Sequence, residues 1–154
     1  MDNKPTLGFL LHDVARFLRK RFEQRARDLG LTRSQWHTLA YLNANEGIHQ
    51  GGLADILEIE PITLVRILDK LQDRGLIERR QHPTDRRIWQ LYLRDAARPL
   101  IAEMKTIGEA TRAEALAGLA EADRDHLVEM LCRMKLNLVA ATTSPADDEE
   151  ARHA

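Results

Sequence analysis

Residues 61–93 constrain this chain most, because a helix with a basic face is followed at once by two strand-like segments. At about 100° per residue, apolar side chains gather on one side of the helical segment and polar or cationic ones on another. The apolar side holds Leu64, Val65, Leu68 and Leu71, and the polar side holds Thr63, Arg66, Lys70 and Arg74. One face is therefore suited to a protein core, while the other is free to contact a partner.

The segments after this helix predict a β-hairpin. Gly75 suits the left-handed turn that ends a helix, and residues 76–80 then begin an extended segment. Residues 88–93 are rich in β-branched and aromatic side chains, with Trp89, Leu91 and Leu93 on one face. Between them, residues 82–87 have the sequence His-Pro-Thr-Asp-Arg-Arg, which combines turn residues with positive charge. We expect a hairpin with a cationic tip.

Positive charge is concentrated locally in this chain. The 154 residues have a formal net charge of -1, so a general attraction to nucleic acid is absent. Residues 61–94 nevertheless hold eight basic and four acidic side chains, a net charge of +4. The remainder is acidic on balance, notably at residues 147–150. Any DNA binding must therefore come from the segment 61–94.

Two helices are predicted before the basic segment. The first covers residues 7–29, where apolar side chains recur about every 3.5 residues, and Gly30 is expected to end it. Thr32 and Gln35 have the spacing of a capping box, in which both side chains bond to backbone groups at the helix start, and they begin the second helix. Residues 43–52 are polar and contain three glycines, so they predict a loop.

A short helix around residues 53–57 follows, and Pro61 suits the first position of the next helix. Helix, turn, helix and hairpin is the order of a winged helix-turn-helix. After Asp95, a predicted N-cap, apolar stripes predict two more helices with a break near residues 118–122. The terminal helices carry more apolar surface than a small DNA-binding core can cover. We expect them to form a dimerisation layer.

The predicted fold class is therefore mainly α with a small β-hairpin (α+β), a winged helix-turn-helix flanked by N- and C-terminal dimerisation helices. Four parts are expected along the chain. They are an N-terminal dimerisation helix at residues 1–30, a winged helix-turn-helix DNA-binding lobe at 31–94, C-terminal dimerisation helices at 95–141 and a disordered acidic tail at 142–154.

The sequence has no convincing catalytic, cofactor or metal pattern. It lacks a glycine-rich phosphate loop, a dinucleotide fingerprint and a nucleophile-elbow serine, and no two histidines have the i, i+4 spacing of a helical zinc site. It also has no signal-peptide pattern and no run near the ~20 apolar residues of a membrane span. The single cysteine, Cys132, fits a reducing cytosol and is expected in buried packing. We expect a cytoplasmic protein that is not an enzyme.

Three segments together resemble the MarR family of bacterial transcription regulators, and most closely its SlyA branch. They are Ile62–Leu71, Asp73–Arg79 and Thr84-Asp85-Arg86-Arg87, and the resemblance extends over roughly residues 7–140. The Asp-Arg-Arg triplet is specific because it lies between two strands and behind this helix. The resemblance implies a homodimer whose recognition helices lie about one DNA turn, ~34 Å, apart on a pseudo-palindromic operator in double-stranded DNA.

By this resemblance, one set of residues contacts DNA: Pro61, Ile62, Thr63, Arg66, Lys70, Asp85, Arg86 and Arg87. Arg66 is the first candidate for base reading, because a guanidinium bridges two acceptors on guanine. Contact with phosphate alone is the alternative. Arg86 suits a narrow A·T-rich minor groove.

The other charged residues of the hairpin have different expected roles. Asp85 is expected to pair with Arg87 or a neighbouring basic group and hold the wing in shape. Whether Arg87 is structural or contacts DNA stays open. For Arg79 and Arg80 we expect a solvated strand face.

The resemblance also implies an effector, since many relatives bind small aromatic acids or phenols and then release DNA. The candidate ligand-binding residues are Arg16, Arg19, Trp36, His37 and Arg66. A flat ring stacked on Trp36 with a carboxylate near an arginine is chemically sensible. The alternative is that Trp36 is core and the arginines are solvated. Relatives that sense peroxide use a cysteine in the N-terminal helix, which this chain lacks, so thiol sensing is not expected.

The expected function is therefore a homodimeric, sequence-specific DNA-binding regulator released by a small aromatic acid or phenolic ligand. Two alternatives stay open. One is an architectural or anti-silencing DNA binder without a ligand. The other is a winged-helix protein-interaction module, whose weak affinity for duplex DNA would fall little with salt.

Overall fold

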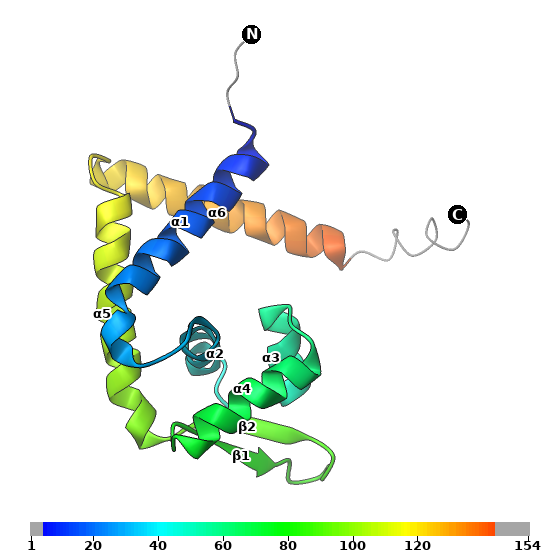
Figure 1. Cartoon of the computed structure of the whole chain (residues 1–154). Coiled ribbons are helices and arrows are strands. Elements are labelled where there is room, and N and C mark those ends of the chain that lie inside the picture. The colour runs from blue at the N-terminus through cyan, green and yellow to red at the C-terminus, as the bar shows by residue number, and fades with distance from the viewer. Residues whose placement is uncertain (1–4, 144–154) are drawn as a thin grey trace. The chain divides into compact units, whose positions relative to one another are not determined.

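The computed structural model describes residues 5–143, which form helices and one antiparallel two-stranded sheet (Figure 1). The helices are α1 (Leu7–Arg25), α2 (Arg33–Ala44), α3 (Gln50–Leu57), α4 (Pro61–Asp73), α5 (Arg98–Ala115) and α6 (Glu121–Thr142), with 3-10 turns η1 (Arg27–Leu29) and η2 (Asp95–Ala97). The strands are β1 (Ile77–Gln81) and β2 (Trp89–Leu93). The predicted fold class, mainly α with a small hairpin, is confirmed.

The chain divides into two compact units, residues 1–113 and 114–154. The four parts expected from the sequence end at other residues than these two units, at 30, 94 and 141. That division into four parts stays a prediction. Thr142, placed in the predicted tail, still belongs to α6. The rest of that tail from residue 144 onward lies outside the described residues.

Local sequence signals set several helix ends as predicted. Thr32 Oγ1 accepts a hydrogen bond from Gln35 N at 3.3 Å, and Gln35 Oε1 accepts one from Thr32 N at 3.1 Å, so the capping box is present. Gly75 has a φ of 70° just past α4, the left-handed turn that glycine adopts without strain. Gly30, with a φ of 65°, ends the 3-10 turn that follows α1 rather than α1 itself.

Two predicted boundaries are wrong. Gly51 and Gly52, expected in a loop, lie inside α3, which begins at Gln50 because His49 Nδ1 accepts a hydrogen bond from Gly52 N at 2.9 Å and caps that end. Asp95 is not an N-cap, because the backbone there first turns as η2 before α5 begins.

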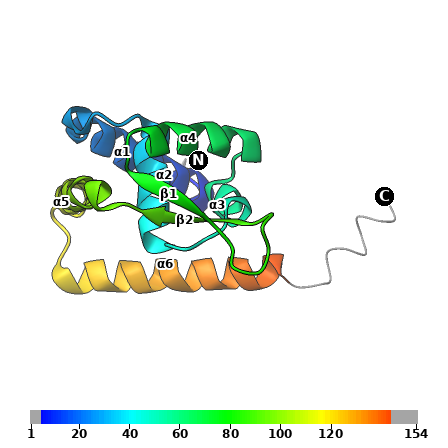
Figure 2. The same cartoon turned by 90° about the horizontal axis from the view of Figure 1, so that it is seen from below.

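One apolar core joins α2, α3, α4 and the hairpin. Each element contributes a side chain with 0% exposure, namely Leu39, Leu53, Leu68, Ile77 and Leu91. Full burial of such a side chain contributes roughly 1.5–3 kcal/mol. The core thus holds α4 along the hairpin, beside which it lies in Figure 2.

The hairpin also pairs with the segment before α3. Its own register places Ile77 opposite Leu93 and Gln81 opposite Trp89. On the outer side of β2, Gly47 N donates to the Leu91 carbonyl at 2.8 Å and Leu91 N donates to the carbonyl of residue 48 at 2.9 Å. The start of α3 is therefore fixed to the hairpin by backbone hydrogen bonds.

Helices α1 and α6 each leave several large apolar side chains exposed, and neither has a buried residue. Those on α1 are Leu7, Phe9, Leu10, Val14 and Phe17, and those on α6 are Val128, Met130, Leu131, Leu136, Leu138 and Val139. Cys132 is exposed as well, so its predicted burial is wrong for the single chain, because α6 buries none of its side chains. Among residues 5–143, no helix combines the length and apolar composition that a membrane crossing requires.

Candidate nucleic-acid interface

The outward face of α4 carries the residues predicted to contact DNA. Its inward face is buried through Leu64, Leu68 and Leu71. Because an α-helix repeats every 3.6 residues, Ile62, Arg66 and Lys70 follow one another along the opposite side. Exposed residues on that side are Ile62, Thr63, Arg66, Asp69, Lys70 and Asp73, and Pro61 is exposed at the start of the helix. The helix thus presents an apolar start and two cations in one row.

Three cations near this face have no partner within the described residues. Arg66, Lys70 and Arg86 are exposed, and their side chains make no hydrogen bond or ion pair with any of residues 5–143. Two lie on α4, and Arg86 lies in the turn between β1 and β2. These charges are available to an external anion, and a polyanion such as duplex DNA would engage both elements.

Arg74 belongs to the α1–α2 connection instead of the cationic row. Its Nη1 donates to the Gly30 carbonyl at 2.8 Å and to Gln35 Oε1 at 3.3 Å. It is the C-cap residue of α4, where the side chain reaches across to the segment before α2. The sequence grouped Arg74 with the polar face, since a helical wheel does not show which other segment lies near the helix end.

Arg79 joins the hairpin to α4 and is not solvated as predicted. Its guanidinium donates to Asp69 Oδ1 at 2.7 Å, to Gln72 Oε1 at 3.0 Å and to the Val65 carbonyl at 3.3 Å. The side chain is only 17% exposed. The prediction of a solvated face is wrong here because the hairpin packs on α4 through this side chain. Arg80 does stay exposed at 59%, paired with Glu78.

The turn of the wing is organised by Asp85, as the sequence predicted. Asp85 Oδ1 accepts from Arg87 N at 3.0 Å and from Arg87 Nε at 3.1 Å, and Oδ2 accepts from Arg87 Nη2 at 3.2 Å. The side-chain hydrogen bonds first, and the backbone bond second, hold the pKa of the Asp85 carboxyl below its usual 3.8. Arg87 remains 90% exposed, so this pairing leaves its guanidinium accessible.

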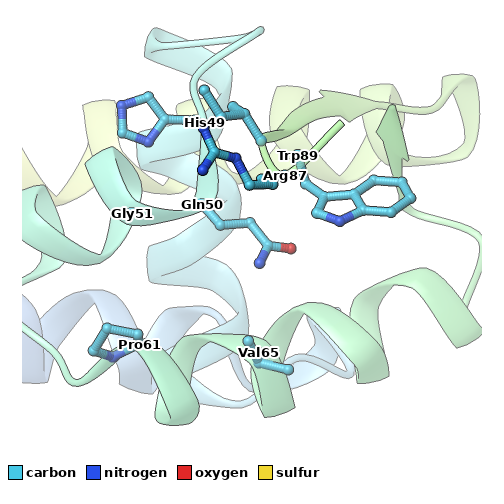
Figure 3. A pocket seen from close by; sticks show the side chains of 8 residues that line it. His49, Gln50, Gly51, Pro61, Val65, Arg87 and Trp89 are labelled. Carbon is cyan, nitrogen blue, oxygen red and sulfur yellow. The ribbon is translucent and has the colours of Figure 1, made fainter. Parts of the chain in front are cut away.

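A groove of about 250 Å³ separates α4 from the wing (Figure 3). Its walls come from three elements: Pro61 and Val65 of α4, His49, Gln50 and Gly51 at the start of α3, and Arg87, Ile88 and Trp89 of the wing. Sequence reasoning missed Gln50 and Trp89 here. No local signal identified Gln50, and Trp89 was assigned to the same strand face as the buried Leu91.

Among the candidate ligand-binding residues, Arg16 and Arg19 lie together. They line a hollow of about 430 Å³ with Lys20, Glu23 and Arg33. Arg33 Nε is 3.0 Å from Glu23 Oε1, so one carboxylate faces several cations. Arg66 is not among the residues that line this hollow.

Trp36 and His37 lie on α2, next to one another. The Trp36 ring packs against Phe22 with centroids 4.5 Å apart and against His37 at 5.6 Å, and Trp36 joins the small cluster around Met104. Burial first, then the positive charges of Arg19 and Arg33, lower the pKa of His37 below 6.5. The pKa of His37 therefore depends on the cations of the hollow, while the Trp36 ring packs against apolar side chains.

An α-helical pair closed by a β-hairpin, with free cations on the second helix and on the hairpin turn, defines a winged helix-turn-helix protein. A family model described as the MarR family matches residues 29–88. The transcriptional regulator PA3341 is 31% identical, with a TM-score of 0.77 over 88% of this chain and 99% of that one. The chain therefore belongs to the MarR family of transcriptional regulators and, as predicted, is not an enzyme.

Two further solved structures are similar over nearly the whole chain. A crystal structure of MarR is 26% identical, with a TM-score of 0.81 and coverage of 92% of this chain and 97% of that one. A MarR family regulator from Listeria monocytogenes, solved in complex with 26mer DNA, is 26% identical, with a TM-score of 0.77 and coverage of 90% and 92%. SlyA matches at 24% identity, which shows the fold alone, so the SlyA branch stays a prediction.

Proposed function

We propose that this MarR family regulator is a homodimer that binds a pseudo-palindromic operator through α4 and the wing. The observation that carries the proposal is the set of unpartnered cations: Arg66 and Lys70 on the outward face of α4, and Arg86 in the wing turn. The similar Listeria regulator was solved in complex with 26mer DNA, which supports DNA as the partner. Acting on chromosomal DNA, the protein would reside in the cytoplasm.

Each contacting residue has a role that fits its position. α4 enters the major groove with Arg66 at the base edges and Lys70 at phosphate. The start of the helix, at Pro61, Ile62 and Thr63, lies against the same groove. Arg86 enters the adjacent minor groove. Asp85 contributes to DNA binding by shaping the turn through its bonds to Arg87.

Dimerisation is proposed through the terminal helices, in the parts 1–30 and 95–141. The support is apolar surface, since α1 and α6 each expose large apolar side chains and bury none of their residues. Contiguous apolar surface of this kind marks a protein interface. Two lobes held by one dimer layer would reach successive major grooves, about 34 Å apart.

The experiment that tests the function is selection of bound fragments from genomic DNA, followed by titration of one selected duplex at several salt concentrations. We expect a palindromic consensus, and a log affinity that falls steeply with log salt because phosphate contacts release counterions. Molar mass in solution should be that of a dimer. Coating of many A·T-rich fragments without a consensus would favour the architectural alternative, and weak, salt-insensitive binding the protein-interaction module.

A small aromatic carboxylate is the proposed effector class, with Arg16 and Arg19 as its anion partners and Trp36 and His37 nearby. The cationic hollow on α1 supports this assignment. Arg66 does not line the hollow, so we assign it to DNA binding and not to the effector site. Salicylate should raise the protein concentration needed for half-saturation of the operator, and Arg19→Gln should weaken that response. If salicylate leaves the half-saturation concentration unchanged in both wild type and Trp36→Ala, the proposed effector class is wrong.

A further inference from the structure

We infer that the groove between α4 and the wing seats the DNA sugar-phosphate strand that separates a major groove from the adjacent minor groove, with Gln50 and Trp89 as additional DNA contacts. This inference rests on the proposed function. It extends the interface from the two elements that enter the grooves to the surface between them. Neither residue was singled out by its sequence context.

Duplex geometry requires such a surface. A major groove and its neighbouring minor groove are divided by one sugar-phosphate strand, so a protein that occupies both must leave room for that strand. In this chain, α4 and the wing turn are the two occupying elements. The groove of about 250 Å³ lies between them, bounded by Pro61 and Val65 on one side and by Arg87 and Trp89 on the other (Figure 3).

The lining matches the chemistry of a nucleotide backbone. Arg87 and the amide of Gln50 offer hydrogen-bond donors, and Trp89 adds an indole N–H. In Figure 3 the Gln50 amide projects into the space between the wing and α4. Apolar surface comes from Pro61, Val65 and Ile88, and no acidic side chain is found among the described residues that line the groove. Donors suit phosphate oxygens, while the apolar walls suit deoxyribose.

Trp89 is more exposed than the other side chains on its face of β2. Along the same face of β2, Leu91 and Leu93 are 0% and 6% exposed, whereas Trp89 is 40% exposed. Its indole N–H and the Gln50 amide make no hydrogen bond within residues 5–143. A large aromatic ring with a free donor at the rim of a groove is typical of a contact surface.

The backbone beside both residues is also tied into the fold before any ligand binds. The bridge between His49 and Gln90 ties the start of α3 to β2, and the His49 ring caps α3 through Gly52 N at 2.9 Å. Gln50 directly follows His49 in the chain, and Trp89 directly precedes Gln90. The groove is therefore preformed, which lowers the entropy cost of binding.

A phosphate-neutralisation scan tests the inference. On the selected operator, one phosphate at a time is replaced by a neutral methylphosphonate, and the affinities of wild type, Gln50→Ala and Trp89→Phe are compared. Trp89→Phe keeps an aromatic ring and removes the N–H. Each variant should bind the unmodified duplex about 10- to 100-fold more weakly, the loss expected for one hydrogen bond to an ionised group.

The expected signature is non-additivity at one phosphate in each half-site. Neutralising that phosphate should weaken wild type, and the further loss in Gln50→Ala and Trp89→Phe should vanish there. Asn43→Ala, a change of an exposed amide on α2, is the matched control and should follow wild type on every duplex.

Two results would overturn the groove assignment while leaving the proposed function intact: variants that bind the operator like wild type, or variants that lose the same factor on every duplex. Thermal unfolding checks that each variant is folded. If wild type itself binds no duplex at low salt, the proposed function and the groove assignment both fall.

Discussion

Arg79 Nη2 donates a hydrogen bond to Asp69 Oδ1 over 2.7 Å, and this ion pair joins β1 to α4. The same guanidinium reaches Gln72 Oε1 and the Val65 carbonyl, so one side chain spans two turns of the helix. A lysine has no planar fork and cannot make these contacts together. The position of the wing relative to α4 therefore depends on Arg79.

Replacing Arg79 should destabilise the lobe. Arg79→Met removes the ion pair and two hydrogen bonds from a side chain that is mostly buried, so the free energy of unfolding should fall by about 1–3 kcal/mol. Arg79→Lys should lose most of the same amount. Urea unfolding followed by circular dichroism measures both. Arg86→Met, a change at an exposed arginine of the same hairpin that makes no side-chain hydrogen bond or ion pair within the described residues, is the control and should stay within roughly 0.5 kcal/mol of wild type.

Replacing Arg66 should lower both the affinity for the operator and the sequence specificity of binding. A guanidinium that bridges two acceptors on guanine contributes about 1–3 kcal/mol of discrimination, so Arg66→Ala should lose that much on the selected site and relax the preference at one base pair. Fluorescence anisotropy with the selected duplex and single-base variants gives both numbers. Equal losses on operator and random DNA would instead assign Arg66 to phosphate.

Replacing Arg86 should affect DNA binding without affecting the fold. Its side chain makes no hydrogen bond or ion pair within the described residues, so Arg86→Ala should unfold at the wild-type temperature. Operator affinity should drop most where the sequence under the wing is A·T-rich, because the narrow minor groove has the deeper negative potential. An unchanged affinity on A·T-rich and G·C-rich flanks would remove Arg86 from the interface.

The protonation of His37 should report on the cationic hollow. Burial and the charges of Arg19 and Arg33 lower its pKa below 6.5, so NMR titration of the ring should have its midpoint below that value. Because the folded-state pKa is depressed, the unfolded chain binds the proton more readily, and stability should decrease as the pH falls below 6.5 toward the folded-state pKa.

Charge changes near His37 should move this midpoint in known directions. Arg33→Gln removes one repulsive charge and should raise the pKa of His37 toward 6.5. A carboxylate bound in the hollow should act in the same direction, since it offsets the arginines. If neither Arg33→Gln nor a bound carboxylate moves the titration midpoint of His37, burial alone sets its pKa.

Residues close together in the sequence made much of the fold predictable. The capping box of Thr32 and Gln35, the turn at Gly75 and the pairing of Asp85 with Arg87 each involve partners a few positions apart, and their geometry follows from local backbone conformation. The outward row of α4 was predictable for the same reason, because helical periodicity alone separates it from the buried leucines.

The sequence by itself determined which helix and turn carry free cations, since that depends on residue type and spacing. Only the tertiary structure decided what lies between them. It turned Arg79 onto α4, directed Arg74 to Gly30 and Gln35, and brought Gln50 and Trp89 into the lining of one groove. These partners lie on different elements, and their contacts depend on how α2, α3, α4 and the hairpin pack together. The shared apolar core fixes that packing, and no local pattern encodes it.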